Sequence, residues 1–446
     1  YYTPTELAEF LSKWAIRAGS DRVLEPSMGD GNFILSSIDA FASLTEGGDG
    51  TVVGIEIDSE ELQKAQDRVG RYENTIVHTD LRLGNFFDQF ELMYNKQERF
   101  DVLLGNPPFI RFQHFDKESQ KRAFDSMERF GYKRNRLANA WIAFIQLGIE
   151  LLEDGGRLAM VVPAELLQVT YAAPLRKRLA EAFEHIVLVN FRYLVFESIQ
   201  QEVVLLLAEG RNCRDNSDSD IHTIELDDGA QLLGYEHFED AVRHASTKHS
   251  RAGMKWTALL LDGESFKALD QTERENSFEK LGALAEVDVG VVTGRNNFFV
   301  LTDEFAKKRD LLKYCRPLVG RTNALPNIFF RERDLLSYSE KAPCWLLDLK
   351  AIDKKEFSQE LLSYIKEGEA AGVNEGYKCR IRKRWYDVPS IYAPDAFLYR
   401  QIHSAPLLVV NDANAVATDT IHRVRLQRGT DVRRLAACFV NSMTFA

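Results

Sequence analysis

The sequence has few cysteines, no long apolar run and no clustered metal ligands. Its five cysteines among 446 residues are scattered, without a C-x-x-C pair. This pattern argues against a disulfide framework and favours a reducing, cytoplasmic compartment. No stretch of 18 or more apolar residues occurs, so no membrane-spanning helix is expected. The nine histidines contain no H-x-x-x-H pair, and no metal is predicted.

The sequence also has no excess of positive charge. Lys and Arg number 56 and Asp and Glu 67, a formal net charge of −11. This balance excludes a uniformly basic nucleic-acid binder, but not a local basic cleft. The length predicts two or three domains. The chain begins at Tyr1 rather than Met and ends without a polar tail, which is compatible with a longer natural chain, truncated here at the C-terminus.

Short apolar runs alternate with longer amphipathic stretches in the first half of the chain. We expect strands at 22–25, 51–57, within 75–83, and at 101–105, 157–163, 185–191 and 203–208. Helices are expected at 5–18, 59–72, 139–153 and 172–183. The alternation predicts a Rossmann-like, seven-stranded, mainly parallel α/β sheet with helices on both faces. Ligands of such sheets bind beyond the carboxyl ends of the strands.

The second half has weaker and mixed periodicity. Strand-like runs occur at 287–292, 298–301, 345–347 and 406–410, which favours a mixed α+β domain. The segment 211–220 is polar and turn-rich, and 244–251 is basic and irregular. We therefore place a domain boundary near Thr247, which divides the chain into 1–246 and 247–446.

A glycine-containing turn follows the first expected strand. The segment reads Glu25-Pro-Ser-Met-Gly29-Asp30-Gly31-Asn-Phe, and the two glycines allow a tight turn and a close approach to a ligand. The third glycine of the dinucleotide pattern is absent. The acidic Glu25 and Asp30 would repel a pyrophosphate and attract a ligand that carries an ammonium and a sulfonium. The loop therefore favours S-adenosylmethionine over a nicotinamide cofactor, although a plain strand-to-helix turn is the simpler alternative.

The second expected strand ends in Gly54-Ile-Glu56-Ile57-Asp58. Glu56 stands where an acidic residue can accept the hydroxyl protons of a ribose. Ile57 offers an apolar face to an adenine ring. Asp58 or Ser59 can cap the next helix, and this capping is compatible with ribose binding by Glu56.

Two prolines directly follow the fourth expected strand, in Gly105-Asn106-Pro107-Pro108-Phe109. They end the strand and stiffen the backbone. The Asn106 side-chain oxygen and the Pro107 carbonyl can together accept both protons of an exocyclic amine. The nitrogen lone pair, normally delocalised into the ring, then becomes available to an incoming methyl group. Phe109 supplies a face on which a planar substrate can stack.

In this order, the segments YYTP, VLEPSMGDGNF, GIEID and LLGNPPF resemble the gamma-class adenine-N6 DNA methyltransferases of restriction–modification systems. The resemblance is close from Tyr1 to about Ala245, and it implies a methyltransferase sheet followed by a C-terminal target-recognition domain. It also implies that Tyr2, Thr3 and Pro4 form an opening segment that contacts the methionine part of the cofactor. Glu25, Gly29 and Gly31 match the cofactor loop, and Glu56 and Ile57 match the ribose and adenine contacts. The catalytic motif is matched by Asn106, Pro107, Pro108 and Phe109.

Two further positions are assigned through the resemblance. The family usually has Asp-Phe after the third strand, where the Asp accepts a hydrogen bond from the cofactor adenine. Here Asn85 and Phe86 occupy that place, and the amide oxygen can still accept, uncharged. Asp80 and Asp88 remain alternatives for this contact. Phe196 matches a second aromatic, expected to stack on the substrate base, and a core phenylalanine is the alternative.

Positive charge gathers near the C-terminal end. From Ala371 to Ala446 there are eleven Lys and Arg against six Asp and Glu, a reversal of the overall sign. Such a region with interleaved aromatics favours a nucleic-acid face, and a solvated basic loop is the alternative. The predicted DNA contacts are Arg295, Asn296, Lys378, Arg380, Arg382, Lys383 and Arg384.

Together these features predict a site-specific adenine-N6 DNA methyltransferase that transfers a methyl group directly from S-adenosylmethionine to a flipped adenine. We expect double-stranded DNA as the partner, a role in restriction–modification or phage defence, and a restriction or defence protein as a further partner. Two alternatives stay open: a methyltransferase acting on RNA or protein glutamine, and a non-catalytic DNA-recognition subunit.

Overall fold

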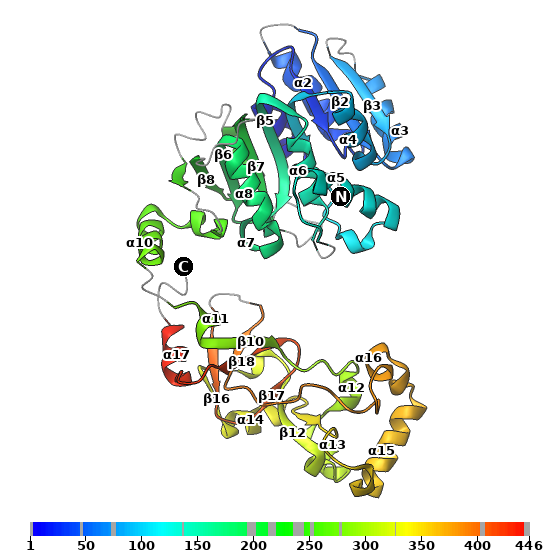
Figure 1. Ribbon diagram of the computed structural model, residues 1–446, viewed down its shortest axis with the longest axis vertical. Coiled ribbons are helices and arrows are strands. Elements are labelled where there is room, and N and C mark those ends of the chain that lie inside the picture. The colour runs from blue at the N-terminus through cyan, green and yellow to red at the C-terminus, as the bar shows by residue number, and fades with distance from the viewer. Residues whose placement is uncertain are drawn as a thin grey trace. The chain divides into compact units, whose positions relative to one another are not determined.

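A computed structural model describes residues 3–44, 48–72, 77–135, 138–193, 202–212, 220–234, 245–249, 254–275, 279–325, 327–401 and 406–440. The chain divides into two compact units, Tyr1–Phe266 and Lys267–Ala446 (Figure 1). The division lies later in the chain than the predicted boundary near Thr247, because that position falls inside strand β9 (Ser246–His249). This strand pairs with the sheet of the first unit.

The first unit is built on a nine-stranded sheet in the order β3-β2-β1-β4-β5-β7-β6-β8-β9. Strands β7 and β9 run antiparallel to their neighbours, and the other pairs are parallel. The remaining strands are β1 (Arg22–Glu25), β2 (Thr51–Glu56), β3 (His78–Leu83), β4 (Phe100–Gly105), β5 (Leu152–Pro163), β6 (Phe183–Phe191), β7 (Val203–Arg211) and β8 (Asp220–Leu226).

All seven predicted strands are present in this sheet, but the sheet has nine strands rather than seven. The two additional strands, β8 and β9, extend it beyond β6. They were not predicted because 211–220 and 244–251 are rich in polar and charged residues. Strand β8 is covered on both faces, because Ile221 is buried in one core of the unit and Ile224 in the other.

Helices cover both faces of the sheet because successive strand residues point to opposite sides. Leu24, Val53 and Leu103 pack into one core with α4 (Phe86–Asn95), α5 (Lys117–Arg129), α6 (Trp141–Ile149) and α8 (Ala173–Ala182). Val23, Val52 and Val102 pack into the other with α1 (Thr5–Ala15), α2 (Asn32–Ser43) and α3 (Ser59–Gly70). The short α7 (Glu165–Gln168) follows β5.

The strand order reverses between β1 and β4, which are adjacent and parallel, with Val23 paired to Val102 and Leu24 to Leu103. The helix after β1 leads to β2 on one side, and the chain after β4 leads to β5 on the other. Such a reversal leaves a crevice outside the carboxyl ends of the two strands, where open α/β sheets bind their ligands. The glycine turn follows β1 and the double-proline corner follows β4, so both border this position.

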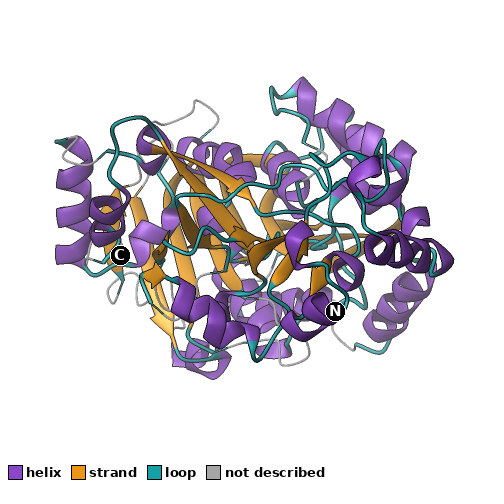
Figure 2. Ribbon diagram, turned by 90° about the horizontal axis from the view of Figure 1, so that it is seen from below, coloured by secondary structure: helices purple, strands orange, loops and turns teal. Residues whose placement is uncertain are grey.

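The second unit mixes short helices with two small sheets. Figure 2 colours the helices and strands of the whole chain separately. One has the order β10-β18-β15-β16-β13 and the other β11-β14-β12-β17. Their bounds are β10 (Ala285–Val289), β11 (Val300–Leu301), β12 (Cys315–Val319), β13 (Phe329–Phe330), β14 (Trp345–Leu347), β15 (Ala396–Tyr399), β16 (Leu408–Asn411), β17 (Val416–Ala417) and β18 (Ile421–Leu426). The helices are α10 (Gly263–Arg274), which crosses the division, α11 (Leu281–Leu284), α12 (Asn296–Phe299), α13 (Asp303–Lys308), α14 (Glu332–Ser339), α15 (Gln359–Ala370), α16 (Tyr377–Arg380) and α17 (Val432–Cys438).

The predicted mixed α+β character of this half agrees with these elements, but the run 298–301 is not a single strand. Its first two residues end helix α12, and only Val300 and Leu301 form a strand. Phe298 is buried in this helix and stacks on Tyr364, with ring centroids 4.5 Å apart. Its apolar character therefore reflects packing against α15 rather than a sheet.

Candidate active site

The glycine turn after β1 requires glycine at its last position. Gly31 precedes α2 with φ +85°, and a Cβ there would lie 2.9 Å from the Cβ of Ala65 on α3. A positive φ is unfavourable for other residues, and the close contact would also push α3 away. The turn therefore places backbone N–H groups near the carboxyl edge of the sheet without side chains in the way.

Glu56 at the end of β2 holds this turn in place. Its Oε2 accepts the Gly29 N–H at 2.8 Å, and its Oε1 accepts the Asp58 N–H at 2.9 Å. Each carboxylate oxygen can accept a second hydrogen bond. Ile57 beside it is 65% exposed, so its apolar face is open. Asp58 caps α3 by accepting the Glu60 N–H at 2.8 Å.

Glu25 is a buried carboxyl group with no ion-pairing cation among the described residues. It is 1% exposed, and its Oε2 has no hydrogen-bond partner among the described residues. Burial raises the pKa of Glu25 well above its usual range, and the nearby carboxylates of Glu56 and Asp30 raise it further. Because a buried unpaired carboxylate is costly, this position favours a positively charged ligand.

Asp30 differs from Glu25 because it has a cationic partner. Arg68 on α3 lies 2.5 Å from Asp30 and also donates to the Asn32 side chain at 3.2 Å. The sequence alone does not distinguish these two acids, because no motif marks Arg68 as the partner of Asp30. The charge of Asp30 is therefore compensated by Arg68, and the repulsion of anions at the turn depends mainly on Glu56.

The double-proline corner lies against both the glycine turn and the opening segment. Asn106 Nδ2 donates to Thr3 Oγ1 at 3.1 Å, and the Asn106 carbonyl accepts the Ser27 hydroxyl at 3.4 Å. A Cβ at Gly105, where φ is +142°, would lie 3.3 Å from Glu25 Cγ. Phe109 is half-buried and packs against both cores. The glycine turn and the proline corner, whose contacting residues Ser27 and Asn106 are 79 apart in the sequence, thus touch directly.

Asn85 follows β3, at the same edge of the sheet. Its Oδ1 accepts the Phe87 N–H at 2.9 Å, and its Nδ2 donates to Ser119 Oγ at 2.9 Å. The amide therefore caps α4 in addition to any contact with a ligand. Phe86 is almost fully buried and stacks on Phe144, with ring centroids 4.9 Å apart, so it offers little free surface.

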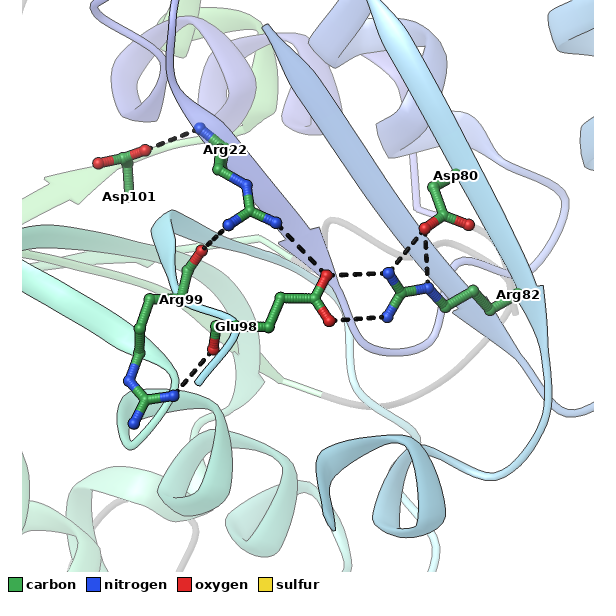
Figure 3. A network of polar contacts seen from close by, with 6 residues as sticks. All are labelled: Arg22, Asp80, Arg82, Glu98, Arg99 and Asp101. Atoms are coloured by element: carbon green, nitrogen blue, oxygen red, sulfur yellow. Dashed lines mark hydrogen bonds and ion pairs between the residues drawn. The ribbon is translucent and has the colours of Figure 1, made fainter. Parts of the chain in front are cut away.

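The two alternatives to Asn85 are engaged elsewhere. Asp88 forms an ion pair with Arg122 at 2.7 Å. Asp80 binds Arg82 at 2.7 Å, and Arg82 in turn binds Glu98 at 2.9 Å (Figure 3). This network continues to Arg22, the first residue of β1, and so lies away from the carboxyl ends of the strands. Of the three candidates, Asn85 alone immediately follows a strand at the ligand edge.

Two predicted site residues, Tyr2 and Phe196, lie outside the described residues. Pro4 precedes α1, and its carbonyl accepts the N–H groups of Leu7 and Ala8. No group of three or more His, Cys, Asp or Glu suited to a metal occurs in the part of the chain that the structure describes. Within the same ranges, no helix is long and apolar enough to cross a membrane.

The predicted basic face of the second unit divides into two groups. Two arginines form hydrogen bonds within the second unit. Arg382 donates to the carbonyls of Thr293 at 2.7 Å and Val292 at 3.2 Å, and burial lowers its pKa. Arg384 pairs with Asp387 at 2.8 Å and donates to three carbonyls between residues 349 and 352. Counting charges could not distinguish these structural arginines from free ones.

The remaining predicted contacts are exposed on two segments that touch each other. A Cβ at Gly294 would lie 2.6 Å from Lys378 Cβ, and a Cβ at Gly376 would lie 3.1 Å from Arg295 Nε. The segment that contains Arg295 therefore lies against the segment that begins at α16. The exposed polar and basic residues are Arg295, Asn296, Lys378, Arg380 and Lys383, which we call the basic face.

Comparison with known proteins agrees with both units. Residues 40–196 match the family model of the Eco57I restriction-modification methylase, and residues 253–446 match the C-terminal domain of the type II methyltransferase M.Eco57I. M.AccI of Acinetobacter calcoaceticus is 23% identical over 398 residues, which cover 87% of this chain and 68% of that protein. M.HindII of Haemophilus influenzae is 24% identical over 330 residues, with 70% and 57% covered.

A solved structure with a similar fold is that of the type IIL restriction-modification enzyme MmeI in complex with DNA. It aligns with a TM-score of 0.58 and 15% identity over 94% of this chain and 57% of that one. The chain thus spans between just over half and about two thirds of the length of these proteins.

The reversed sheet, the glycine turn and the proline corner define an α/β protein of the methyltransferase class. Within that class, the chain belongs to the restriction–modification methyltransferases, whose two Eco57I models match most of its length. The resemblance inferred from the motifs is confirmed at this level.

Proposed function

We propose that this chain is an adenine-N6 DNA methyltransferase that uses S-adenosylmethionine and acts on a base flipped out of the duplex. The observation that carries the proposal is the state of the Asn106 amide. Its Nδ2 is bonded to Thr3, while its Oδ1 has no partner among the described residues. The free oxygen is an acceptor next to the glycine turn, as a substrate amine requires.

Asn106 would act on the nucleophile rather than on a proton. Its Oδ1 and the Pro107 carbonyl would accept hydrogen bonds from the two N–H groups of the base amine and so localise the nitrogen lone pair. The buried Pro107 ring and the adjacent Pro108 restrict the backbone that carries both acceptors. Such fixed acceptors stabilise the charge that develops as the amine attacks. As the new N–C bond forms, the methyl–sulfur bond would break and leave a neutral thioether, and one amine proton would then pass to solvent.

The residues around the turn fit S-adenosylmethionine. The unpartnered, buried Glu25 suits a cation, and the remaining lone pairs of Glu56 suit ribose hydroxyls. Ile57 offers an exposed apolar face to the adenine, with Asn85 at the next strand end. The cofactor supplies an electrophilic methyl group on its sulfonium. Thr3 and Pro4 lie at the same edge, where the methionine part would be held.

A duplex substrate requires the adenine to leave the stack, at a cost of a few kcal/mol. Stacking on an aromatic side chain returns about 1–3 kcal/mol per contact. Phe109, with Phe196 on the other side of the base, would offset much of the cost. The basic face supplies cations for phosphates, and the similar fold of MmeI was solved with DNA. In this proposal the first unit carries out methyl transfer and the second unit recognises the target.

The proposal is tested with tritiated S-adenosylmethionine and four acceptors: unmethylated genomic duplex DNA, the same DNA denatured, total RNA, and a glutamine-containing peptide. Label is expected in duplex DNA, and the Asn106→Ala variant should bind cofactor but transfer no methyl group. Label in RNA or peptide alone would replace DNA as the substrate. DNA binding without any methyl transfer would make the chain a recognition subunit.

A further inference from the structure

The opening segment reaches the catalytic corner through one side chain. Thr3 is 7% exposed, and its hydroxyl oxygen accepts the Asn106 Nδ2–H at 3.1 Å. No other described residue bonds to this amide nitrogen. The main-chain carbonyl of Thr3 accepts the Asn32 Nδ2–H at 2.8 Å, and Asn32 is the first residue of α2. One residue thus contacts both the proline corner and the glycine turn.

The bond to Thr3 matters because it fixes the position of the Asn106 side chain beside the glycine turn. With Nδ2 held by Thr3, Oδ1 points away from the hydroxyl and is available to a substrate amine. Loss of this bond frees the side-chain torsions of Asn106, so that Oδ1 is no longer held where the amine needs an acceptor.

The position of Thr3 is itself fixed from two sides. Pro4 restricts the backbone, with φ −51°, and leads directly into α1. On the other side, Asn32 is held by Arg68 at 3.2 Å, and Arg68 is paired with Asp30 of the glycine turn at 2.5 Å. The hydroxyl is therefore not free to follow the amide if the amide turns.

We propose that Thr3 is a positioning residue whose hydroxyl holds the Asn106 side chain where its Oδ1 meets the substrate amine, and whose carbonyl links that position to the glycine turn. This inference rests on the proposed adenine methylation. It differs from the cofactor contact that the family resemblance implies for this position, because it acts on the rate of methyl transfer and not on cofactor affinity.

The test compares Thr3→Val, which keeps the shape and removes the hydroxyl, with Thr3→Ser, which keeps the hydroxyl. Thr5→Val serves as a matched control, because Thr5 is exposed at the start of α1. Single-turnover methylation of unmethylated genomic DNA gives the transfer rate, and titration with S-adenosylmethionine gives its Kd. Thermal unfolding identifies any variant that fails to fold.

We expect Thr3→Val to slow methyl transfer about tenfold, the effect of one hydrogen bond of ordinary strength, with the cofactor Kd unchanged within about twofold. Thr3→Ser and Thr5→Val should transfer at nearly the wild-type rate. Full activity of Thr3→Val would overturn the inference, and so would a raised Kd at an unchanged rate. If Thr3→Val does not fold, a serine variant with a tenfold loss also overturns it. Absence of DNA methylation by the wild-type chain would instead reject the proposed function.

Discussion

Replacing Glu25 by Gln should stabilise the protein and weaken cofactor binding. Glu25 is buried, carries an unpartnered Oε2, and has a pKa raised above its ordinary value of 4.5 by burial and by two nearby carboxylates. A binding site that holds an uncompensated acid sacrifices stability for affinity, since the carboxylate is useful only when a cation is bound. Glutamine keeps the shape and removes the charge.

The sign of the pH dependence follows from the direction of the pKa shift. Below pH 4.5 the carboxyl is protonated in both the folded and the unfolded chain, and the substitution changes little. Above that pH the unfolded chain releases the proton and the folded chain retains it. The wild-type protein therefore loses about 1.4 kcal/mol of stability per pH unit until the raised pKa is reached. The Glu25→Gln variant does not lose stability in this way as the pH rises.

The expected magnitude can be followed by thermal unfolding without cofactor between pH 4.5 and 8. One kcal/mol shifts Tm by roughly 2–4 °C for a unit of this size. The Tm advantage of Glu25→Gln should therefore grow by about 3–6 °C per pH unit above pH 4.5, and then level off. Glu6→Gln, at an exposed position on α1, is the matched control and should show no such growth.

Cofactor binding supplies the second half of this test. Losing a charge-assisted contact of about 1.5–3 kcal/mol should weaken S-adenosylmethionine binding by roughly 10- to 150-fold. S-adenosylhomocysteine lacks the sulfonium but keeps the ammonium, so comparing the two ligands shows which cation Glu25 meets. A Tm difference that is independent of pH, or unchanged binding of both ligands, would refute this account of Glu25.

Four further substitutions test other parts of the chain. Gly31→Ala should lower stability by about 1–3 kcal/mol, because of its positive φ and its closeness to Ala65; an unchanged Tm would contradict this. Lys383→Ala should reduce the slope of log Kd against log salt for DNA by about one unit without changing Tm. Arg382→Ala should lower Tm instead, because it removes hydrogen bonds to two backbone carbonyls. If Lys383→Ala lowered Tm and Arg382→Ala changed the salt slope, Arg382 would be the DNA contact and Lys383 the structural residue. Phe196→Ala should weaken capture of the flipped base, and normal fluorescence of a base analogue at the target would argue against its stacking role.

The catalytic edge could be predicted from sequence because its chemistry is concentrated at strand ends. Buried strands are recognisable as short apolar runs, and parallel strands bring their carboxyl ends to one edge. Glu25, Glu56 and Asn106 each stand at or just after such a run. Their proximity therefore required only the strand assignments and the direction of the chain.

Contacts between distant segments could not be predicted in the same way. Arg382 and Arg384 count as positive charge in the sequence, but their partners are backbone carbonyls tens of residues away. Arg68 satisfies Asp30 from a helix surface with no recognisable motif. Strand β9 was missed because a four-residue edge strand carries too little periodicity to be seen in a basic segment.

The most direct test of the central claim is the chemical position of the transferred methyl group. Unmethylated duplex DNA is incubated with S-adenosylmethionine and the chain, digested to nucleosides, and measured by mass spectrometry, with Asn106→Ala in parallel. The account predicts N6-methyladenine with the wild-type chain and none with the variant. Methylated cytosine in place of adenine, or equal N6-methyladenine from both proteins, would contradict it.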